Sequence, residues 1–205
     1  MKKLSILVMI CVLIFSIVGV VFADTGATTI EPKRVGEIKD LNVPLYQQVD
    51  HYACGPVCVR MVLKYFGYTI SETQAKSLCK MVENQGTDLG NMVNAVNSKL
   101  GRTAYYRRYT SSTSFVDKTI NSLRNDYPVI CLVKPKYLPN YTITNTSAGH
   151  YVVVDGYSLQ AGADTTIVLR YNDPHYDDDY YGSHSAVLSQ MLVAVQACGG
   201  EYMTH

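Results

Sequence analysis

Gln48-Val-Asp-His-Tyr-Ala-Cys54-Gly-Pro56 is followed at once by a helical pattern that runs to Gly67. Proline suits the first turn of a helix, where its missing N–H costs nothing. Apolar residues then recur at steps of three and four, which predicts one buried face made of Cys58, Met61, Val62, Tyr65 and Phe66. We therefore expect a helix that begins at Cys54, stops at Gly67 and holds Cys54 rigidly at its N-terminus.

Cys54 is the candidate nucleophile. A thiol is mostly protonated at neutral pH, and the partial positive charge of a helix N-terminus stabilises the thiolate. A lone cysteine is more often a buried core residue, but Gly55-Pro56 after it and Gln48 six residues before it favour the nucleophile. The side-chain N–H of Gln48 and the backbone N–H of Cys54 would form an oxyanion hole for acyl transfer. Gln47 is the adjacent alternative.

Two later stretches supply the partners that an activated thiol needs: Gly149-His150-Tyr-Val-Val-Val154 and Tyr171-Asn172-Asp173-Pro174. His150 would accept the thiol proton and later protonate the leaving amine, and Asp173 would hold the imidazole tautomer. Asp-Pro is also a common turn pair, so a purely structural Asp173 is the competing interpretation. His51 and His175 lie near these stretches in sequence but lack their placement.

Together these stretches resemble the papain-like peptidases that process bacteriocins with double-glycine leaders, in a stand-alone exported form without transporter domains. The resemblance implies a papain-like fold with Gln48, Cys54, His150 and Asp173 as the active set. It extends over roughly residues 43–175, in family order, through Val43–Gln48, Cys54–Gly67, Gly86–Gly90, Tyr127–Ile130, Gly149–Val154 and Asn172–Pro174. Two departures are that the sequence ends at His205, without the membrane and ATPase domains of transporter members, and that the 23-residue step from His150 to Asp173 is slightly long. The second keeps Asn172 open as the third member.

The N-terminus has the pattern of an export signal. Lys2 and Lys3 precede an apolar stretch from Leu4 to Phe22, and small residues favour cleavage after Ala23. An uncleaved membrane anchor is the alternative. We expect a signal peptide over 1–23, a flexible lead-in over 24–40 and one peptidase domain over 41–205. Cleavage removes two of the 18 basic side chains and leaves 16 against 17 acidic ones, without a basic stripe, which argues against a nucleic-acid partner.

The remaining cysteines and the acidic run indicate neither a disulfide framework nor a metal centre. Cys58 and Cys131 fall in apolar patterns and are predicted to be small core residues, so we expect few or no disulfides, with Cys79 and Cys198 undecided. Asp177-Asp-Asp179 near His175 and His184 admits a metal site. A solvated acidic loop is favoured, because consecutive carboxylates rarely all ligate. No cofactor and no metal are therefore expected.

The fold class expected is α+β, with helices packed on an antiparallel sheet. After the Cys54 helix, Ser71–Gln74 resembles a capping box that opens a helix to about Met81. Further helices are expected over residues 88–100 with Thr87 as cap, over 114–125, and from Ser185 to about 197. Strands are expected over 103–109, 128–133, 150–157 and 165–171, with a possible bulge at Asp155-Gly156 and a short last strand after Gly199-Gly200. The long loop from Lys134 to Ala148 would border the substrate cleft.

The sequence thus predicts an exported, monomeric cysteine peptidase that acts on a peptide or protein and is free of the membrane after signal removal. Two other hypotheses for the function remain. The same thiol site could serve a cell-wall peptide amidase or an acyl transferase. The chain could also be a non-catalytic binding module on a peptidase scaffold, which the intact Gln48, Cys54, His150 and Asp173 set argues against.

Overall fold

The computed structural model describes residues 36–142, 148–160 and 166–205. The predicted signal peptide over 1–23 and the lead-in up to residue 35 lie outside these ranges. Within them, no helix is both long and apolar enough to cross a membrane.

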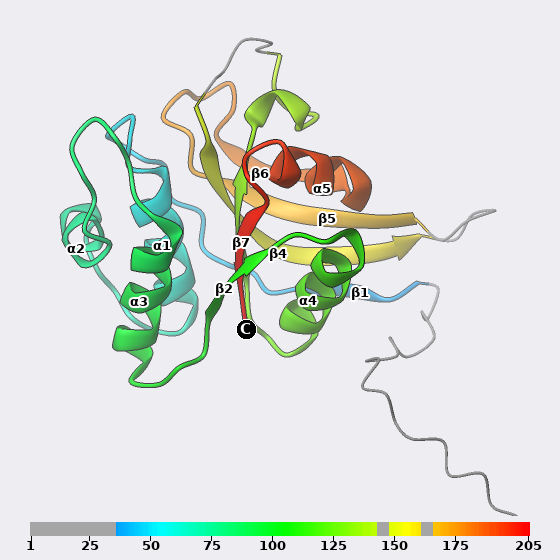
Figure 1. The fold of residues 1–205 in the computed structure, drawn as a ribbon, viewed down its shortest axis with the longest axis horizontal. Helices are drawn as coiled ribbons and strands as arrows, with labels where there is room; N and C mark the ends of the chain where they lie inside the picture. Colours follow the sequence, from blue (N-terminus) through cyan, green and yellow to red (C-terminus); the bar gives the residue numbers. More distant parts are fainter. Residues whose placement is uncertain (1–35, 143–147, 161–165) are drawn as a thin grey trace, which may run out of the picture. The chain divides into compact units, whose positions relative to one another are not determined.

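A seven-stranded antiparallel sheet forms the centre of the described part (Figure 1). Six strands run in the order β2-β7-β3-β4-β5-β6, and β1 pairs with the far half of β4. β4 is buried along nearly its whole length, as expected for a strand with elements packed on both faces. The strands are β1 (Ile38–Asp40), β2 (Tyr106–Tyr109), β3 (Val129–Val133), β4 (His150–Gln160), β5 (Thr166–Asp173), β6 (Gly182–Val187) and β7 (Glu201–Thr204).

The helices flank this sheet in two groups. Figure 1 shows α1, α2 and α3 gathered on one side of the strands and α4 and α5 on the other. α1 packs against β4 and against both of its helical neighbours, whereas α5 contacts β3, β5 and β6. The helices are α1 (Cys54–Tyr65), α2 (Glu72–Leu78), α3 (Leu89–Leu100), α4 (Ser112–Arg124) and α5 (Leu188–Gln196), with a short 3₁₀ turn η1 (Pro135–Tyr137).

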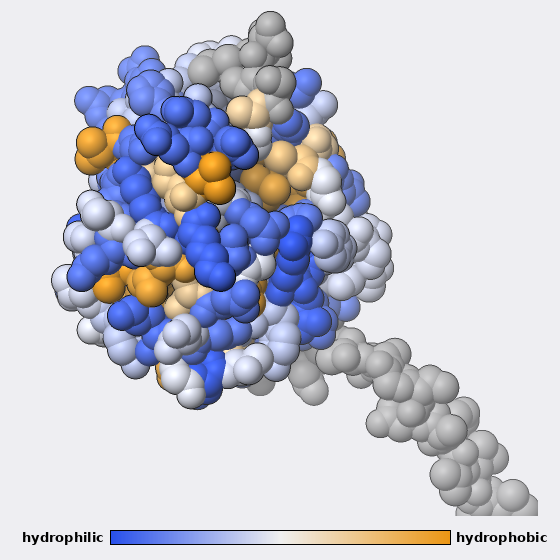
Figure 2. Space-filling model, turned by 60° about the vertical axis from the view of Figure 1, so that its left-hand side comes forward, coloured by the Kyte–Doolittle hydropathy of each residue, from blue (hydrophilic) through white to orange (hydrophobic). Residues whose placement is uncertain are grey.

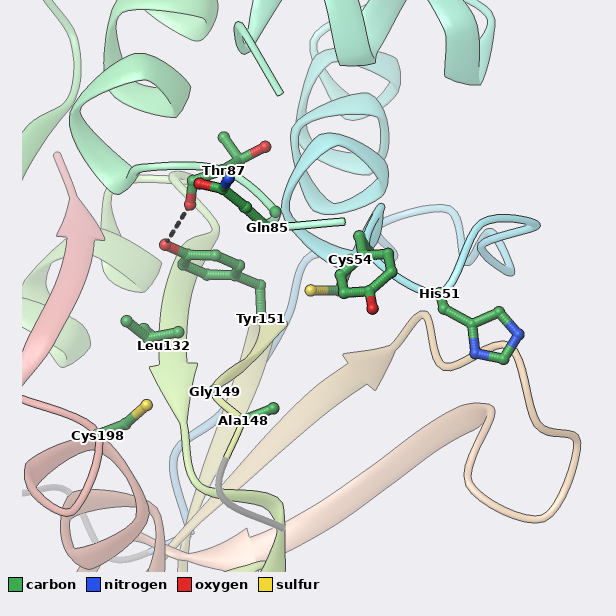
Figure 3. A pocket seen from close by; sticks show the side chains of 11 residues that line it. His51, Cys54, Gln85, Thr87, Leu132, Ala148, Gly149, Tyr151 and Cys198 are labelled. Carbon is green, nitrogen blue, oxygen red and sulfur yellow. Dashed lines mark hydrogen bonds between the residues drawn. The ribbon is translucent and has the colours of Figure 1, made fainter. Parts of the chain in front are cut away.

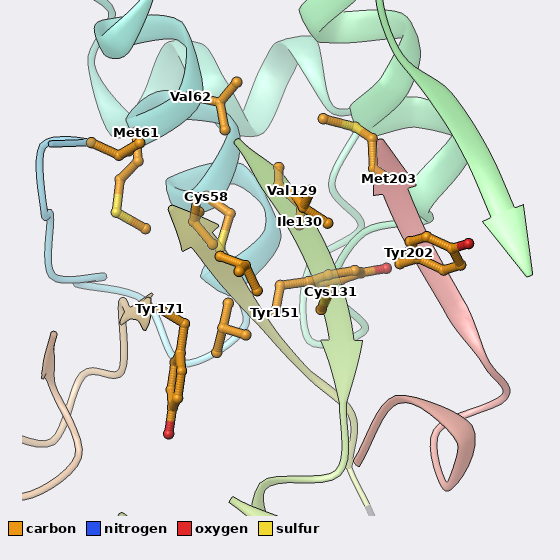
Figure 4. Close-up of a cluster of buried hydrophobic side chains, with 14 of the residues drawn as sticks. Cys58, Met61, Val62, Val129, Ile130, Cys131, Tyr151, Tyr171, Tyr202 and Met203 are labelled. Carbon is orange, nitrogen blue, oxygen red and sulfur yellow. The ribbon is translucent and has the colours of Figure 1, made fainter. Parts of the chain in front are cut away.

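The core lies between α1 and the central strands. In Figure 4, Cys58 and Val62 lie on the side of α1 that faces β3, within a fully buried set that also includes Met61, Val129, Ile130, Cys131, Tyr202 and Met203. On the face in Figure 2, hydrophobic residues reach the surface in small separate areas between hydrophilic ones. The predicted buried face of the Cys54 helix is therefore what attaches this helix to the sheet.

The α+β class and several local predictions are confirmed. Ser71 caps α2 in a reciprocal capping box with Gln74. β4 carries a bulge between Val154 and Gly156. Glycine is required there because a Cβ on Gly156 would lie 2.6 Å from the carbonyl oxygen of Lys39 on β1.

Other predictions are wrong in their boundaries. Asp88, not Thr87, caps α3 by accepting from the Gly90 N–H at 2.8 Å. The last helix begins at Leu188, because residues 182–187 pair with β5 as an edge strand. Residues 38–40 of the predicted flexible lead-in form β1 on β4 instead. Sheet pairing over long sequence distances, which no local pattern reveals, causes the last two differences.

Candidate active site

α1 begins at Cys54, and this sets the environment of the thiol. The first N–H groups of a helix have no partner within it, and α1 has no acidic residue in its first turn to compete for them. The sulfur of Cys54 accepts from the backbone N–H groups of Gly55 and Tyr151. The helix start and the sheet therefore both contribute donors to a thiolate.

The structure brings Cys54, His150 and Asp173 together in one chain of hydrogen bonds. His150 is the first residue of β4 and Asp173 the last of β5, so adjacent strands deliver both to the N-terminus of α1. The thiol of Cys54 is hydrogen-bonded to His150. His150 Nε2 lies 2.7 Å from Asp173 Oδ1, which leaves Nδ1 for the sulfur. Both His150 and Asp173 are buried.

The pKa values of the three groups shift toward an ion pair. Burial of the Cys54 thiol opposes ionisation, but the hydrogen bond and positive charge of His150 outweigh it, and the pKa of Cys54 falls below its ordinary value. Burial likewise opposes charge on His150, yet Asp173 raises the pKa of His150 to about 10. The pKa of Asp173 is lowered against its burial by the charge of His150. The arrangement favours a thiolate beside an imidazolium at neutral pH.

Two further residues contact Asp173, and neither was predicted from the sequence to belong to the site. The hydroxyl of Tyr141 donates to Asp173 Oδ2 at 2.8 Å, and the backbone N–H of His175 donates to Oδ1 at 2.9 Å. The rings of both residues lie edge-on to His150, at centroid distances of 6.3 and 5.5 Å. Tyr141 belongs to the long loop that was expected to border the cleft, and that loop was the one available signal for it.

Gln48 lies close to the site, but its amide is turned inward. Its backbone N–H donates to the carbonyl of Pro174 at 2.8 Å, which ties it to the segment after Asp173. Gln48 Nε2 donates to the carbonyl oxygens of Asp50 and His51, while its buried Oε1 lacks a partner among the described residues. Gln47 instead reaches Tyr176 and Asp178, away from the thiol.

Asn172 faces a different cluster. Its Nδ2 donates to the carbonyl of Val43 at 2.9 Å and to Asp155 Oδ2 at 3.1 Å, and its Oδ1 accepts from the hydroxyl of Ser183. Successive strand residues point to opposite faces, so Asn172 and Asp173 cannot both meet His150. In this structure the partner of the imidazole is Asp173.

Two clefts open beside the reactive groups. The larger, of about 410 Å³ and here named the Cys54 cleft, holds the nucleophile and is shown in Figure 3. It is lined by His51, Tyr52, Cys54, Gln85, Gly86, Thr87, Leu132, Ala148, Gly149, Tyr151 and Cys198. The smaller, of about 150 Å³ and here named the His150 cleft, is lined by Gln48, His51, Pro135, Tyr141, Ala148, Gly149, His150, His175 and Tyr176. Both ends of the loop over 134–148 thus border a cleft.

The other candidate ligands and thiols take no part in this chain of bonds. Across 36–142, 148–160 and 166–205, no group of three potential ligands could hold a metal ion. Asp177 and Asp178 accept from Asp179 N and from Gln47. The described cysteines are unpaired, with Cys58, Cys79 and Cys131 buried and Cys54 and Cys198 partly exposed.

Solved structures with the same fold include several peptidases. A protein from Bacillus anthracis described as a C39-like peptidase superposes with a TM-score of 0.59 at 16% identity, covering 82% of this chain and 96% of that one. The peptidase domain of the Streptococcus transporter ComA gives 0.51 at 24% identity, with 78% and 96% covered. Bromelain from Ananas comosus, solved with the inhibitor E64, gives 0.56 at 13% identity, with 83% and 98% covered. At these identities the likeness establishes the papain-like fold.

The family is shown by sequence. No curated protein matches the chain, but the model of the Peptidase_C39-like family matches residues 40–191. That range contains all of the residues that converge on the thiol, from Gln48 to Asp173. The chain therefore belongs to the Peptidase_C39-like family and is a cysteine-type peptidase.

Proposed function

We propose that this protein hydrolyses peptide bonds through a thioester on Cys54, with His150 as the acid and base and Asp173 as the group that orients it. The observation that carries the proposal is the continuous chain of hydrogen bonds from Cys54 through His150 to Asp173. In the first step, the thiolate attacks the scissile carbonyl and the imidazolium gives its proton to the leaving amine. In the second, His150 takes a proton from water, and the resulting hydroxide releases the acid and the free thiol.

The oxyanion of each tetrahedral intermediate needs donors near the sulfur. The backbone N–H of Cys54 is one, since first-turn N–H groups lack partners within the helix. We propose Gln48 as the second. The support for this role is that Gln48 Oε1 is buried without a hydrogen-bond partner among the described residues, so the present orientation of the amide leaves one hydrogen bond unmade. Its Nε2 would have to exchange the carbonyls of Asp50 and His51 for the substrate oxygen.

The test compares wild-type protein with Cys54→Ala and His150→Ala on a broad peptide library. Both variants should lose at least about a thousand-fold in kcat/KM. His205→Ala is the matched control, because His205 is exposed and stacks on Tyr127 away from the site, and it should keep wild-type turnover. If wild type hydrolyses nothing, yet wild type and Cys54→Ala bind one peptide equally well, the protein is a binding module and the proposal fails.

The oxyanion role of Gln48 has its own matched pair. Gln48→Ala should lower turnover about a hundred-fold while Cys54 still reacts with an alkylating agent. Gln47→Ala should leave turnover unchanged, because Gln47 bonds to Tyr176 and Asp178. A loss in the Gln47 variant and none in the Gln48 variant would reverse the assignment.

We also propose that the protein acts outside the cytoplasm after cleavage behind Ala23. The support is the sequence pattern of residues 1–23: two lysines, an apolar stretch and a small residue at each expected position. Terminal sequencing of the protein from the culture medium should give Asp24 as the first residue. A membrane-bound product that begins at Met1 or Lys2 would show an anchored enzyme instead.

A further inference from the structure

The two clefts lie on different sides of the scissile bond. His150 must give its proton to the departing amine, so the leaving half of the substrate lies against the imidazole. Of the two clefts, the His150 cleft contains this imidazole and the Cys54 cleft does not. The acyl half, which becomes bonded to the sulfur, is therefore left with the Cys54 cleft.

The lining of the Cys54 cleft suits an apolar substrate side chain. None of its eleven lining residues is Asp, Glu, Lys or Arg. The Tyr151 hydroxyl is engaged at 3.0 Å by the carbonyl of Thr87, so its ring presents carbon to the cleft. Burial raises the pKa of Cys198, so this thiol is uncharged at neutral pH and behaves as a small apolar group. Beyond the nucleophile Cys54 itself, which reacts with the substrate carbonyl, the lining holds no Asp, Glu, Lys or Arg to act as counter-ion for a charged substrate side chain.

The shape of the Cys54 cleft at its end away from Cys54 depends on the absence of a side chain at Gly149. Figure 3 shows Cys54 and Cys198 at opposite ends, with Tyr151 between them. A Cβ on Gly149 would lie 2.7 Å from the sulfur of Cys198 and 2.9 Å from Leu132 Cδ1. A larger residue before His150 would therefore push into the wall that Cys198 and Leu132 make. The cleft volume of about 410 Å³ falls in the range that holds small ligands, and a glycine residue would leave most of it empty.

We propose that the Cys54 cleft is a specificity pocket for a large apolar side chain on the acyl side of the bond. The side chain belongs to one of the two residues that precede the scissile bond, since each extended residue spans only about 3.5 Å and the cleft starts at the nucleophile. This inference rests on the proposed hydrolysis. It differs from a requirement for two glycines before the bond, the specificity that the sequence resemblance implies.

The test profiles the full chain on a quenched-peptide library, with products identified by mass spectrometry so that each cleaved bond is known. Wild type should favour Leu, Ile, Met or Phe at one of the two acyl-side positions. Cys198→Phe fills the pocket and should lower kcat/KM for these peptides about tenfold, with a smaller effect where glycine or alanine stands there. Cys198→Glu adds a counter-ion and should raise cleavage of peptides with Lys or Arg at that same position above wild type, a gain that misfolding cannot mimic.

Val193→Phe and Val193→Glu are the matched controls, because Val193 is exposed on α5 and does not line the cleft. Both should keep the wild-type preference. Cleavage that requires glycine at both acyl-side positions would overturn the pocket while leaving the proposed hydrolysis intact, as would preferences that neither Cys198 variant moves. Wild-type protein that cleaves no peptide would overturn both proposals.

Discussion

Asp155 and Asp173 are both fully buried, on the neighbouring strands β4 and β5, yet they pair with bases of different kinds. Asp155 is held by a bidentate pair with Arg170, at 2.9 and 2.6 Å, and by the amide of Asn172. Asp173 is held by His150, by the Tyr141 hydroxyl and by a backbone N–H. Arginine is always charged, whereas histidine titrates near neutral pH.

We infer from this difference that Asp155 serves the fold and Asp173 the proposed chemistry. Burial raises the pKa of Asp155 even against Arg170, whose guanidinium stays charged across the working pH range. The pKa of Asp173 is lowered against equal burial, because the site keeps His150 protonated. A buried carboxylate paired with a histidine has a partner that can gain or lose a proton, whereas a carboxylate paired with an arginine has a partner of constant charge. Variants of the two clusters should therefore fail in different ways.

Among substitutions in the two carboxylate clusters other than that of His150 itself, Asp173→Ala should produce the largest effect. It removes the group that orients His150 and stabilises its charge, so kcat/KM should fall about a thousand-fold in protein that is still folded. The loss should be smaller than that of His150→Ala, and the two losses should not add in the double variant, since the residues act as one unit. Steady-state kinetics on purified variants, with circular dichroism for the fold, measures this. Additive losses would separate Asp173 from His150.

Arg170→Met should act on stability instead. It leaves the Asp155 carboxylate buried without its cation, which should lower the free energy of unfolding by about 3 kcal/mol. The specific activity of the folded fraction should stay near wild type. Urea denaturation measures the change. The matched control is Arg102→Met, because Arg102 is exposed and its guanidinium donates only to the hydroxyl of Tyr127 among the hydrogen bonds described, and it should cost less than about 1 kcal/mol. A large activity loss in Arg170→Met would break the comparison.

Asp173→Asn should shift the pH profile more than the maximal rate. In wild type, the imidazolium is present below the raised pKa of His150, about 10, and activity is lost as the pH rises through it. The neutral amide still accepts from His150 but removes the negative charge, so that pKa falls and the alkaline limb moves to lower pH. The loss at the optimum should be about tenfold. An alkaline limb that stays in place would show that Asp173 does not set the charge of His150.

Tyr141→Phe should have the smallest effect. It removes one hydrogen bond to Asp173 and keeps the ring that stacks on Tyr180 at 4.5 Å. A bond of this kind to a charged group contributes about 1.5 kcal/mol, which corresponds to roughly tenfold at most in turnover. The alkaline limb should move to slightly higher pH, because the charge of Asp173 is then shared only between His150 and the backbone N–H of His175. Tyr180→Phe is the control and should leave the profile unchanged.

The sequence predicted the parts of the site that have local patterns. Cys54 at a helix start follows from Pro56 and the apolar spacing after it, and His150 and Asp173 follow from their strand contexts. Tyr141 could not be predicted, because only the folded loop brings it to Asp173, and the contact of His175 is made by a backbone N–H two residues after Asp173, which no side-chain pattern records. The edge strand β6 was mistaken for the start of a helix because Ser183 and Ser185 carry no apolar pattern. Thr87 was mistaken for a helix cap because Thr and Asp88 are both good caps.

The inward turn of the Gln48 amide was likewise beyond sequence reasoning. Spacing places Gln48 near Cys54, and the structure does the same. The direction of the amide depends on the carbonyls of Asp50 and His51, because both accept hydrogen bonds from Gln48 Nε2. Hydrogen-bond acceptors nearby set the direction of such a side chain, and the spacing of residues in the sequence does not reveal them.

The central claim is that His150 and Asp173 activate Cys54, and the pH dependence of its alkylation tests this. The rate of modification by iodoacetamide, with the label mapped to individual cysteines, should rise with a midpoint below that of an ordinary thiol, whose pKa is about 8.5. In His150→Ala the midpoint should return to that value or above, because burial then acts on the thiol without a cation. Equal midpoints in the two proteins, or label that enters Cys198 before Cys54, would contradict the account.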